Sequence, residues 1–267
     1  MKSSGSISTE FVFQVIALLV AVILVHAVYV TVVRPGAQEA LERERAAMAS
    51  DPDHVAERSL FVVVRDYEQE ACFVLMLWAF AIMGYKAVAT MRARALLDED
   101  LVPVTAGMRI LPEDSRPLQR GLEAMPTPRR RQLLPRALLA ALHRFDSARN
   151  VQDVSQAAQA ICTAEGERLE SELSLIRYIA WAIPSVGFIG TVRGIGDALG
   201  KAHRAVEGDI SGVTESLGVA FNSTLIALII SIVVMFVVHQ LQLAQERFVL
   251  DAEAYCEEKL IRHLHTG

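Results

Sequence analysis

The stretch IAWAIPSVGFIGTVRGIGDAL, residues 179–199, is followed after a short gap by an apolar stretch at residues 217–243 that contains AFNSTLIALIISI. Each stretch is long enough to cross a bilayer, because about 20 helical residues span the hydrocarbon core. Each also carries a threonine at membrane depth, Thr191 in the first and Thr224 in the second. A hydroxyl in hydrocarbon needs a hydrogen-bonding partner, which another helix or a water-lined path can supply. The two threonines therefore indicate a conduit rather than a simple anchor.

The composition of the chain favours a membrane protein. Of its 267 residues, 52% are hydrophobic, and the mean hydropathy is +0.33, which is more apolar than soluble domains usually are. The net charge of −5 argues against nucleic-acid binding by bulk attraction. The three cysteines show no metal-ligand spacing, and the sequence contains no nucleophile elbow or phosphate loop. We therefore expect no bound metal, no cofactor and no enzymatic activity.

Four apolar segments predict an all-α membrane protein with four transmembrane helices, at residues 11–33, 71–89, 179–199 and 217–243. In the first segment only Gln14 and His26 are strongly polar. Its apolar core is too long for a signal peptide, and no convincing cleavage site follows it. We interpret this segment as a retained anchor.

Basic residues near the ends of the spans predict the orientation. The segment 90–178 is rich in arginine, whereas the segment 34–70 is mostly acidic. The positive-inside rule then makes 90–178 a cytoplasmic helical domain, 34–70 a periplasmic loop and 200–216 a periplasmic turn. Lys201 and Arg204 in that turn run against the rule. Both termini are expected in the cytoplasm, with residues 1–10 as the N-terminal segment and residues 244–267 as a C-terminal helix.

Apolar residues at steps of three and four predict long helical extensions in the cytoplasm. Residues 136–178 contain no proline, and their periodicity predicts one amphipathic helix that runs directly into the third span. The tail after Leu243 repeats the same pattern. The run Arg129, Arg130, Arg131 is either a solvated or lipid-headgroup-binding patch or a docking surface for a cytoplasmic partner.

The third and fourth spans each present a face of small, partly polar residues. The face of the third span comprises Pro184, Gly187, Thr191, Gly194 and Ala198, and that of the fourth comprises Ala220, Ser223, Thr224, Ala227 and Ser231. Two such faces can line a narrow vestibule. They can also pack against each other, with the hydroxyls bonded to carbonyls one turn earlier. The residue pattern alone leaves both interpretations open.

The stretch GFIGTVRGIGDAL, with SLGVAFNSTLIALIISI further along the chain, resembles the MotA/TolQ/ExbB proton-channel family. Gly190, Thr191 and Val192 match the Gly-Thr-Val element of that family, and Ala220 and Thr224 match its Ala-x-x-x-Thr element. The resemblance covers residues 171–243 and implies that the two elements face each other across a pore. It also implies a homopentameric ring around a dimer of a MotB/TolR/ExbD-like single-span protein, whose membrane aspartate carries the ion.

The residues and the resemblance together predict a ring-forming subunit of an ion-driven motor, a stator or energy transducer in the bacterial inner membrane. We expect ions to pass beside Thr191 and Thr224, with further oxygens from Ser223 and Asn222, and Gly190 among the small pore-facing residues. A proton is the default ion, and sodium remains an alternative. The competing interpretation is a passive membrane scaffold or receptor subunit, which needs neither threonine.

Arg193 departs from the family pattern, which often has a large apolar or aromatic residue at this position. An arginine inside a span costs about 2.5–3.5 kcal/mol on insertion scales. Asp197 lies four residues later on the same helix face, so we expect an Arg193–Asp197 ion pair. The functional alternative is a positive gate that tunes cation entry or pairs with the acid of the partner. We find no strong candidate for the ion-carrying acid in the membrane core of this chain, which agrees with an acid supplied by the partner.

Overall fold

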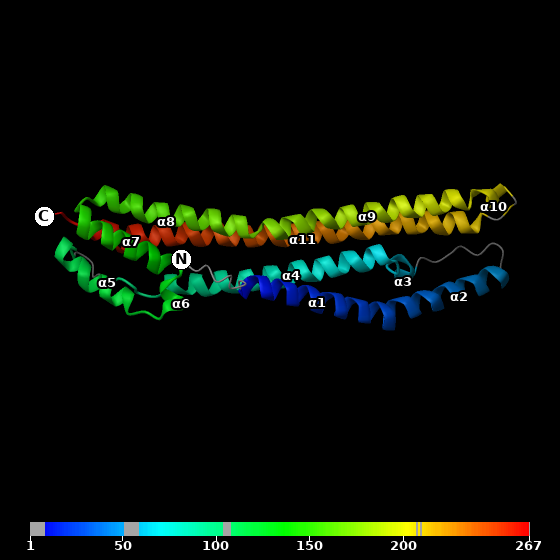
Figure 1. The fold of residues 1–267 in the computed structure, drawn as a ribbon, viewed down its shortest axis with the longest axis horizontal. Coiled ribbons are helices and arrows are strands. Elements are labelled where there is room, and N and C mark those ends of the chain that lie inside the picture. Colours follow the sequence, from blue (N-terminus) through cyan, green and yellow to red (C-terminus); the bar gives the residue numbers. More distant parts are fainter. Residues whose placement is uncertain (1–8, 51–58, 104–107, 207, 209, 267) are drawn as a thin grey trace, which may run out of the picture. The chain divides into compact units, whose positions relative to one another are not determined.

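A computed structural model describes residues 9–50, 59–103, 108–206, 208 and 210–266 of the chain. Within these residues the fold is helical and contains no strand; an isolated bridge pairs Ile110 with Leu264. The helices, shown in Figure 1, are α1 Thr9–Val28, α2 Arg34–Ser50, α3 Leu60–Val63, α4 Tyr67–Arg94, α5 Ser115–Glu123, α6 Thr127–Arg130, α7 Leu133–Ala148, α8 Val151–Glu172, α9 Ser174–Gly200, α10 Ala202–Val206 and α11 Ser211–Lys259. A π-helical segment occupies Tyr29–Val33, and 3₁₀ turns lie at Ala95–Asp98, Pro112–Asp114 and Ile261–His263.

Four helical segments are long and apolar enough to cross a membrane: Thr9–Ala47, Tyr67–Asp98, Val151–Gly200 and Ser211–His263. Each contains one of the four predicted spans. In the most apolar part of each segment, only 17–33% of the residues are buried within the chain. Most of their apolar side chains therefore face outward, as they do where lipid or neighbouring chains cover a helix.

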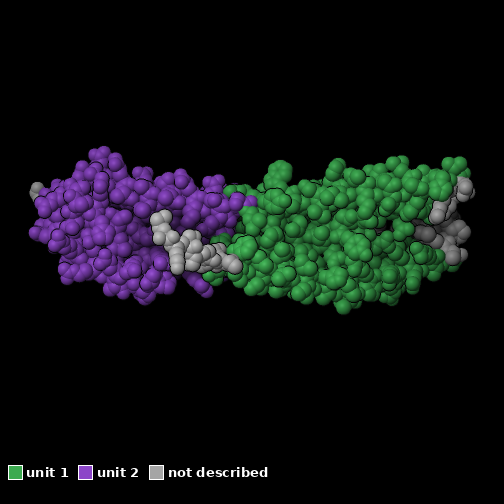
Figure 2. Space-filling model, in the orientation of Figure 1, with its two compact units in different colours: residues 1–83, 175–238 green, residues 84–174, 239–267 purple. Residues whose placement is uncertain are grey.

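The chain forms two compact units, coloured separately in Figure 2. The first comprises residues 1–83 and 175–238, and the second comprises residues 84–174 and 239–267. The first unit holds all of α1, most of α4 and α9, and the N-terminal part of α11, and therefore the predicted site.

The first helix continues into the segment that was expected to be a loop at residues 34–70. α1 passes through the π-helical segment into α2, which ends only at Ser50, and α3 follows later in the same segment. Pro35 lies inside this continuous helical run, where it has no N–H to donate and its ring crowds the carbonyl four residues earlier. The wider π turn before it accommodates the proline ring, and the backbone N–H of Arg34 donates to the carbonyl of Tyr29.

In the first unit α4 packs against both α1 and α9. Val25, Tyr29 and Val33 of α1 and the π-helical segment form a buried cluster with apolar residues of α4 and its preceding turn. The Trp78 indole N–H donates to the carbonyl of Gln14 across this contact, at 2.9 Å. On the other side of α4, the fully buried Cys72 lies against the Ile183 carbonyl of α9. α4 is thus the element that joins the N-terminal helix to the α9–α11 pair.

The prediction of a single long helix over residues 136–178 is wrong, because the structure divides this segment between α7 and α8 in the second unit. Arg149 ends α7 in the left-handed conformation, with φ of 47°. Asn150 then caps α8, its side-chain oxygen accepting a hydrogen bond from the Gln152 backbone N–H. Asparagine competes with helical backbone bonding and favours this capping position, so a short polar interruption reverses the chain.

The reversal builds an apolar core between α7, α8 and the C-terminal part of α11. Leu138, Leu142 and Phe145 of α7 are fully buried there, and residues of α8 and α11 complete the cluster. α8 meets α9 with only Leu173 between them, so the expected run into the third span is interrupted by a single residue. α11 continues for 49 residues and includes both the fourth predicted span and most of the predicted C-terminal helix.

Candidate functional site

The small faces of α9 and α11 lie directly against each other. Gly187, Gly190 and Gly194 of α9 are buried at this contact. A Cβ added at Gly194 would lie 2.8 Å from the Cβ of Ala220, and one at Gly190 would lie 2.6 Å from the Cβ of Ser223. Two non-bonded carbon atoms cannot lie this close together, so the absence of a side chain at these glycines permits the close approach of the two helices. We call this contact the α9–α11 seam.

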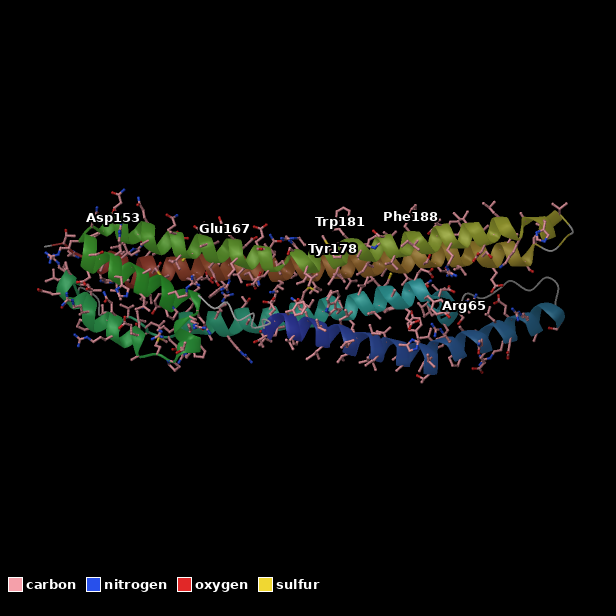
Figure 3. The ribbon with its side chains drawn as sticks, viewed as in Figure 1. Arg65, Asp153, Glu167, Tyr178, Trp181 and Phe188 are labelled. Carbon is pink, nitrogen blue, oxygen red and sulfur yellow. The ribbon has the colours of Figure 1, made fainter. Side chains whose placement is uncertain are left out.

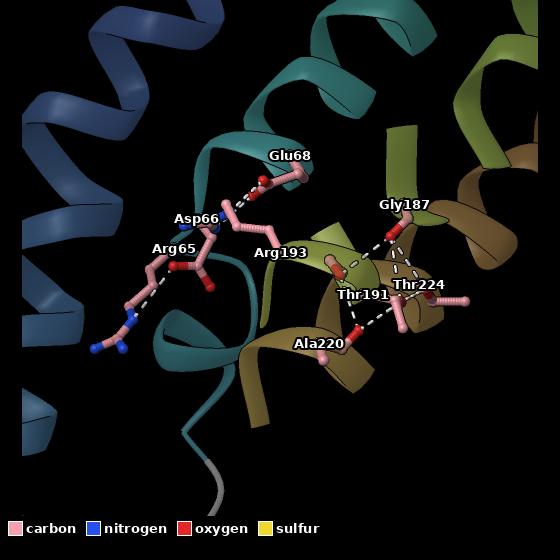
Figure 4. Close-up of polar contacts among 9 residues, drawn as sticks. Arg65, Asp66, Glu68, Gly187, Thr191, Arg193, Ala220 and Thr224 are labelled. Carbon is pink, nitrogen blue, oxygen red and sulfur yellow. Dashed lines mark hydrogen bonds and ion pairs between the residues drawn. The ribbon is translucent and has the colours of Figure 1, made fainter. Parts of the chain in front are cut away.

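Thr191 and Thr224 meet in the seam, as Figure 4 shows. Their hydroxyls are hydrogen-bonded to each other. The Thr191 hydroxyl also lies 3.0 Å from the Ala220 carbonyl oxygen, and the Thr224 hydroxyl lies 3.1 Å from that of Gly187. Both side chains are half-buried in the single chain. The two threonines that the sequence singled out, 33 residues apart, are thus one polar site.

The hydrogen bonds leave either threonine better able to accept a further hydrogen bond than to donate one. Each hydroxyl has one proton and two lone pairs. The Thr191 proton has the Ala220 carbonyl, the Gly187 carbonyl and the Thr224 oxygen as possible acceptors. A threonine would therefore have to release a carbonyl or the other threonine before it could donate to a carboxylate, whereas it can accept from a protonated carboxyl group through a free lone pair.

The other predicted site residues take different places around the seam. Ser223 is fully buried, and its hydroxyl donates to the Ala220 and Gly187 carbonyls, at 2.9 and 3.2 Å. Ser231 donates to the Ala180 carbonyl of α9. Ala220 and Ala227 are fully buried, and Pro184 and Asn222 are half-buried. Within one chain, the small faces are thus packed against each other, and the hydroxyls are bonded to carbonyls.

The expected ion pair between Arg193 and Asp197 is wrong. Arg193 instead reaches α4, where its Nε donates to Oε1 of Glu68 at 2.7 Å and its Nη2 donates to Oε2 at 2.8 Å (Figure 4). A bidentate pair matches the planar fork of the guanidinium, which a carboxylate on the next turn of the same helix cannot match as well. Asp197 itself is exposed.

Glu68 belongs to a charged cluster around the start of α4 that the sequence reasoning missed. Arg65, just before α4, pairs with Glu215 of α11 at 2.9 Å. Glu70 is bonded to Arg34 at 2.6 Å and to His26 at 2.7 Å. The acidic residues of the first turn of α4 are favoured there by the helix dipole. The sequence signal is the placement of Glu68 and Glu70 immediately before an apolar run.

Asp66, in the turn before α4, is the strained member of this cluster. Burial raises its pKa above the usual value of 3.8, and the nearby Arg65 guanidinium opposes that rise. Its Oδ2 is buried without a hydrogen-bond partner among the described residues. The ionised form of Asp66 is therefore disfavoured in the folded chain.

Among the residues that the structure describes, no group of three or more His, Cys, Asp and Glu side chains could hold a metal ion. The chemistry that the described site can offer is hydroxyl and carbonyl oxygens in the seam and ion pairs at its α4 side.

Comparison with known proteins gives one match. Residues 129–254 match the model of a family described as the MotA/TolQ/ExbB proton channel family. The match covers α7, α8, α9 and most of α11, and so includes both threonines and the whole seam. No curated protein and no solved structure matches the chain.

Proposed function

Because residues 129–254 form a MotA/TolQ/ExbB proton channel family domain in a chain with four membrane-crossing helices, we propose that the protein is the ring-forming subunit of an ion-driven motor. In this proposal a homopentamer in the bacterial inner membrane encloses a dimer of a single-span partner. The ion gradient drives motion of the ring against that partner. Both termini and the segment 90–178 are cytoplasmic, and the segments 34–70 and 200–216 are periplasmic.

The Thr191–Thr224 contact is the observation that carries the proposal. A carboxyl group of the partner that arrives protonated can donate to a threonine lone pair, as the hydrogen bonds of the seam allow. An ionised carboxylate would have to draw a hydroxyl away from a carbonyl or from the other threonine. The seam therefore favours the neutral, proton-loaded acid, which makes a proton the expected ion. Ser223 helps to hold α9 against α11 at this site, because its hydroxyl donates to the Ala220 and Gly187 carbonyls.

The outer faces of α9 and α11 suit a ring of chains. Trp181 and Phe188 project from α9 in Figure 3 and are 75% and 64% exposed. Phe221, Ile232 and Phe236 of α11 are similarly exposed. Such continuous apolar surface is covered in a membrane by lipid or by neighbouring chains.

The test measures proton flux in liposomes that contain a pH-sensitive dye. The full-length chain is co-expressed with a single-span protein that has an aspartate in its span, and the purified complex is reconstituted in these liposomes. The variants T191V and T224V remove one hydroxyl each and keep the branched shape of the side chain. We expect flux per particle to fall at least tenfold in both, with the mass of the particle unchanged. T31V is the matched control, because the Thr31 hydroxyl is also bonded one turn back, to Ala27, but lies in the π-helical segment after α1.

The alternative is a passive scaffold, and one observation favours it. Every hydroxyl of the seam already has a carbonyl oxygen of the chain within hydrogen-bonding distance, as helix packing alone would require. A scaffold would assemble normally and show no proton flux in the wild type. Unchanged flux in T191V and T224V would equally refute the role that we assign to the threonines. A sodium gradient applied in place of a proton gradient distinguishes the two ions.

A further inference from the structure

The Glu68–Arg193 pair lies beside the seam, and its two side chains differ in their exposure to solvent. The Glu68 side chain is 11% exposed, whereas that of Arg193 is 43% exposed. Two hydrogen bonds in one plane hold the carboxylate against the guanidinium. Such a bidentate pair fixes orientation as well as distance, which a single contact does not. The pair therefore defines how α9 is turned relative to α4.

Gly190 links this pair to the threonines. A Cβ at Gly190 would lie 3.0 Å from Cγ of Glu68 on one side and 2.6 Å from Cβ of Ser223 on the other. α9 is thus held at Gly190 between α4 and α11. Thr191 is the next residue, so a rotation of α9 that released Glu68 would also turn Thr191 away from Thr224.

We propose that the Glu68–Arg193 pair is a clamp that positions Thr191 against Thr224, and that Arg193 does not act as a positive gate. The bearing of the clamp on ion transport rests on the proposed function, but its effect on the seam does not. In this role Glu68 and Arg193 are positioning residues, and what matters is the bond between them rather than the charge of either one.

A clamp and a gate predict different results for neutral variants. R193Q leaves the Glu68 carboxylate, whose side chain is 11% exposed, without its cation, which favours displacement of α4 from α9. E68Q leaves the more exposed Arg193, which can reach water, so its effect is smaller. The double variant E68Q/R193Q removes both charges and keeps two amide groups that can bond to each other, so the clamp predicts rescue. For a positive gate, R193Q and the double variant would behave alike, because both lack the charge.

The first measurement is the rate of disulfide formation in the T191C/T224C chain, oxidised in native membranes and identified by mass spectrometry of the linked peptides. The natural cysteines Cys72, Cys162 and Cys256 can remain, because all three are fully buried. We expect R193Q to slow the reaction at least tenfold, E68Q to slow it less, and E68Q/R193Q to return it to within about twofold of the reference. R43Q, which removes an exposed arginine paired with Glu39 on α2, is the matched control and should change nothing.

Equal rates in all variants would overturn the clamp, and so would a double variant as slow as R193Q. This measurement needs neither a partner nor an ion gradient, so it stands even if the proposed function fails. The second measurement is proton flux per assembled particle, where we expect a loss in R193Q and recovery in E68Q/R193Q. If T191V abolishes the flux while R193Q retains it fully, the clamp is wrong and the proposed function stands.

Discussion

Gly194→Ala is the sharpest test of the seam, because the added methyl group meets backbone atoms that cannot move aside. Its Cβ would lie 2.8 Å from the Cβ and the backbone nitrogen of Ala220 and from the carbonyl oxygen of Ser216. Non-bonded carbon atoms prefer about 3.5–4.0 Å. The two helices must therefore separate locally by about 1 Å, which would stretch the 3.0 Å contact of Thr191 with the Ala220 carbonyl beyond hydrogen-bonding range.

Gly196→Ala on the same helix is the matched control, because nothing lies within 4 Å of the added Cβ. Both variants gain the same intrinsic helix propensity, about 1 kcal/mol over glycine. The difference between them therefore isolates the cost of overpacking, about 1–3 kcal/mol. For a chain of this size that corresponds to a melting temperature lower by roughly 2–12 °C.

The assay is thermal unfolding of the purified full-length variants in detergent, followed by helical circular dichroism, together with disulfide formation in T191C/T224C. We expect G194A to melt below G196A and to form the disulfide more slowly. Equal melting temperatures and equal cross-linking would refute the close approach of α9 and α11 at Gly194.

Three further changes test other parts of the fold. N150A removes the cap of α8 and should lower the free energy of unfolding by about 1 kcal/mol. N150D keeps an acceptor for the Gln152 N–H and should lower it little. Equal losses of stability in thermal melts of the two variants would contradict the cap. R34M leaves His26 as the remaining partner of the Glu70 carboxylate, whose side chain is 12% exposed. It should destabilise the chain by at most about 3–5 kcal/mol, and by more than E70Q does; urea titration of both variants gives the order, and the reverse order would show that Glu70 does not need the cation. D66N should stabilise the chain at pH 7, because burial raises the pKa of Asp66 and its ionised form is disfavoured in the folded state. That gain should vanish below about pH 3.8, where the carboxyl group is protonated in both folded and unfolded chains; a gain that persists there would have another cause.

The sequence predicted the features that depend on periodicity and on short-range spacing. Four apolar segments predicted the four helices that are long and apolar enough to cross a membrane, and glycine and alanine at helical steps predicted the faces that meet in the seam. Thr191 and Thr224 could be paired because each lies on such a face. What these residues do in an assembled particle stays a prediction.

Contacts between distant parts of the chain could not be read in the same way. Arg193 was assigned a partner four residues away, because only neighbours on one helix have a known geometry before folding. Its actual partner, Glu68, is 125 residues away on α4. The reversal at Arg149 and Asn150 depends on a local cap. The apolar periodicity continues on both sides of that cap, so it predicted one unbroken helix.

The π-helical segment at Tyr29–Val33 has a consequence for how this chain tolerates insertions and deletions. A π turn holds one residue more than an α turn, so the segment carries a surplus residue just before Pro35. Deleting that residue would restore a regular helix and leave the residues after it facing nearly the same way, because the wider turn already absorbs the extra residue. The loss of one codon in this segment would thus preserve both the register of α1 against α4 and the surface that α2 presents, whereas the same loss within α1 or α2 would not.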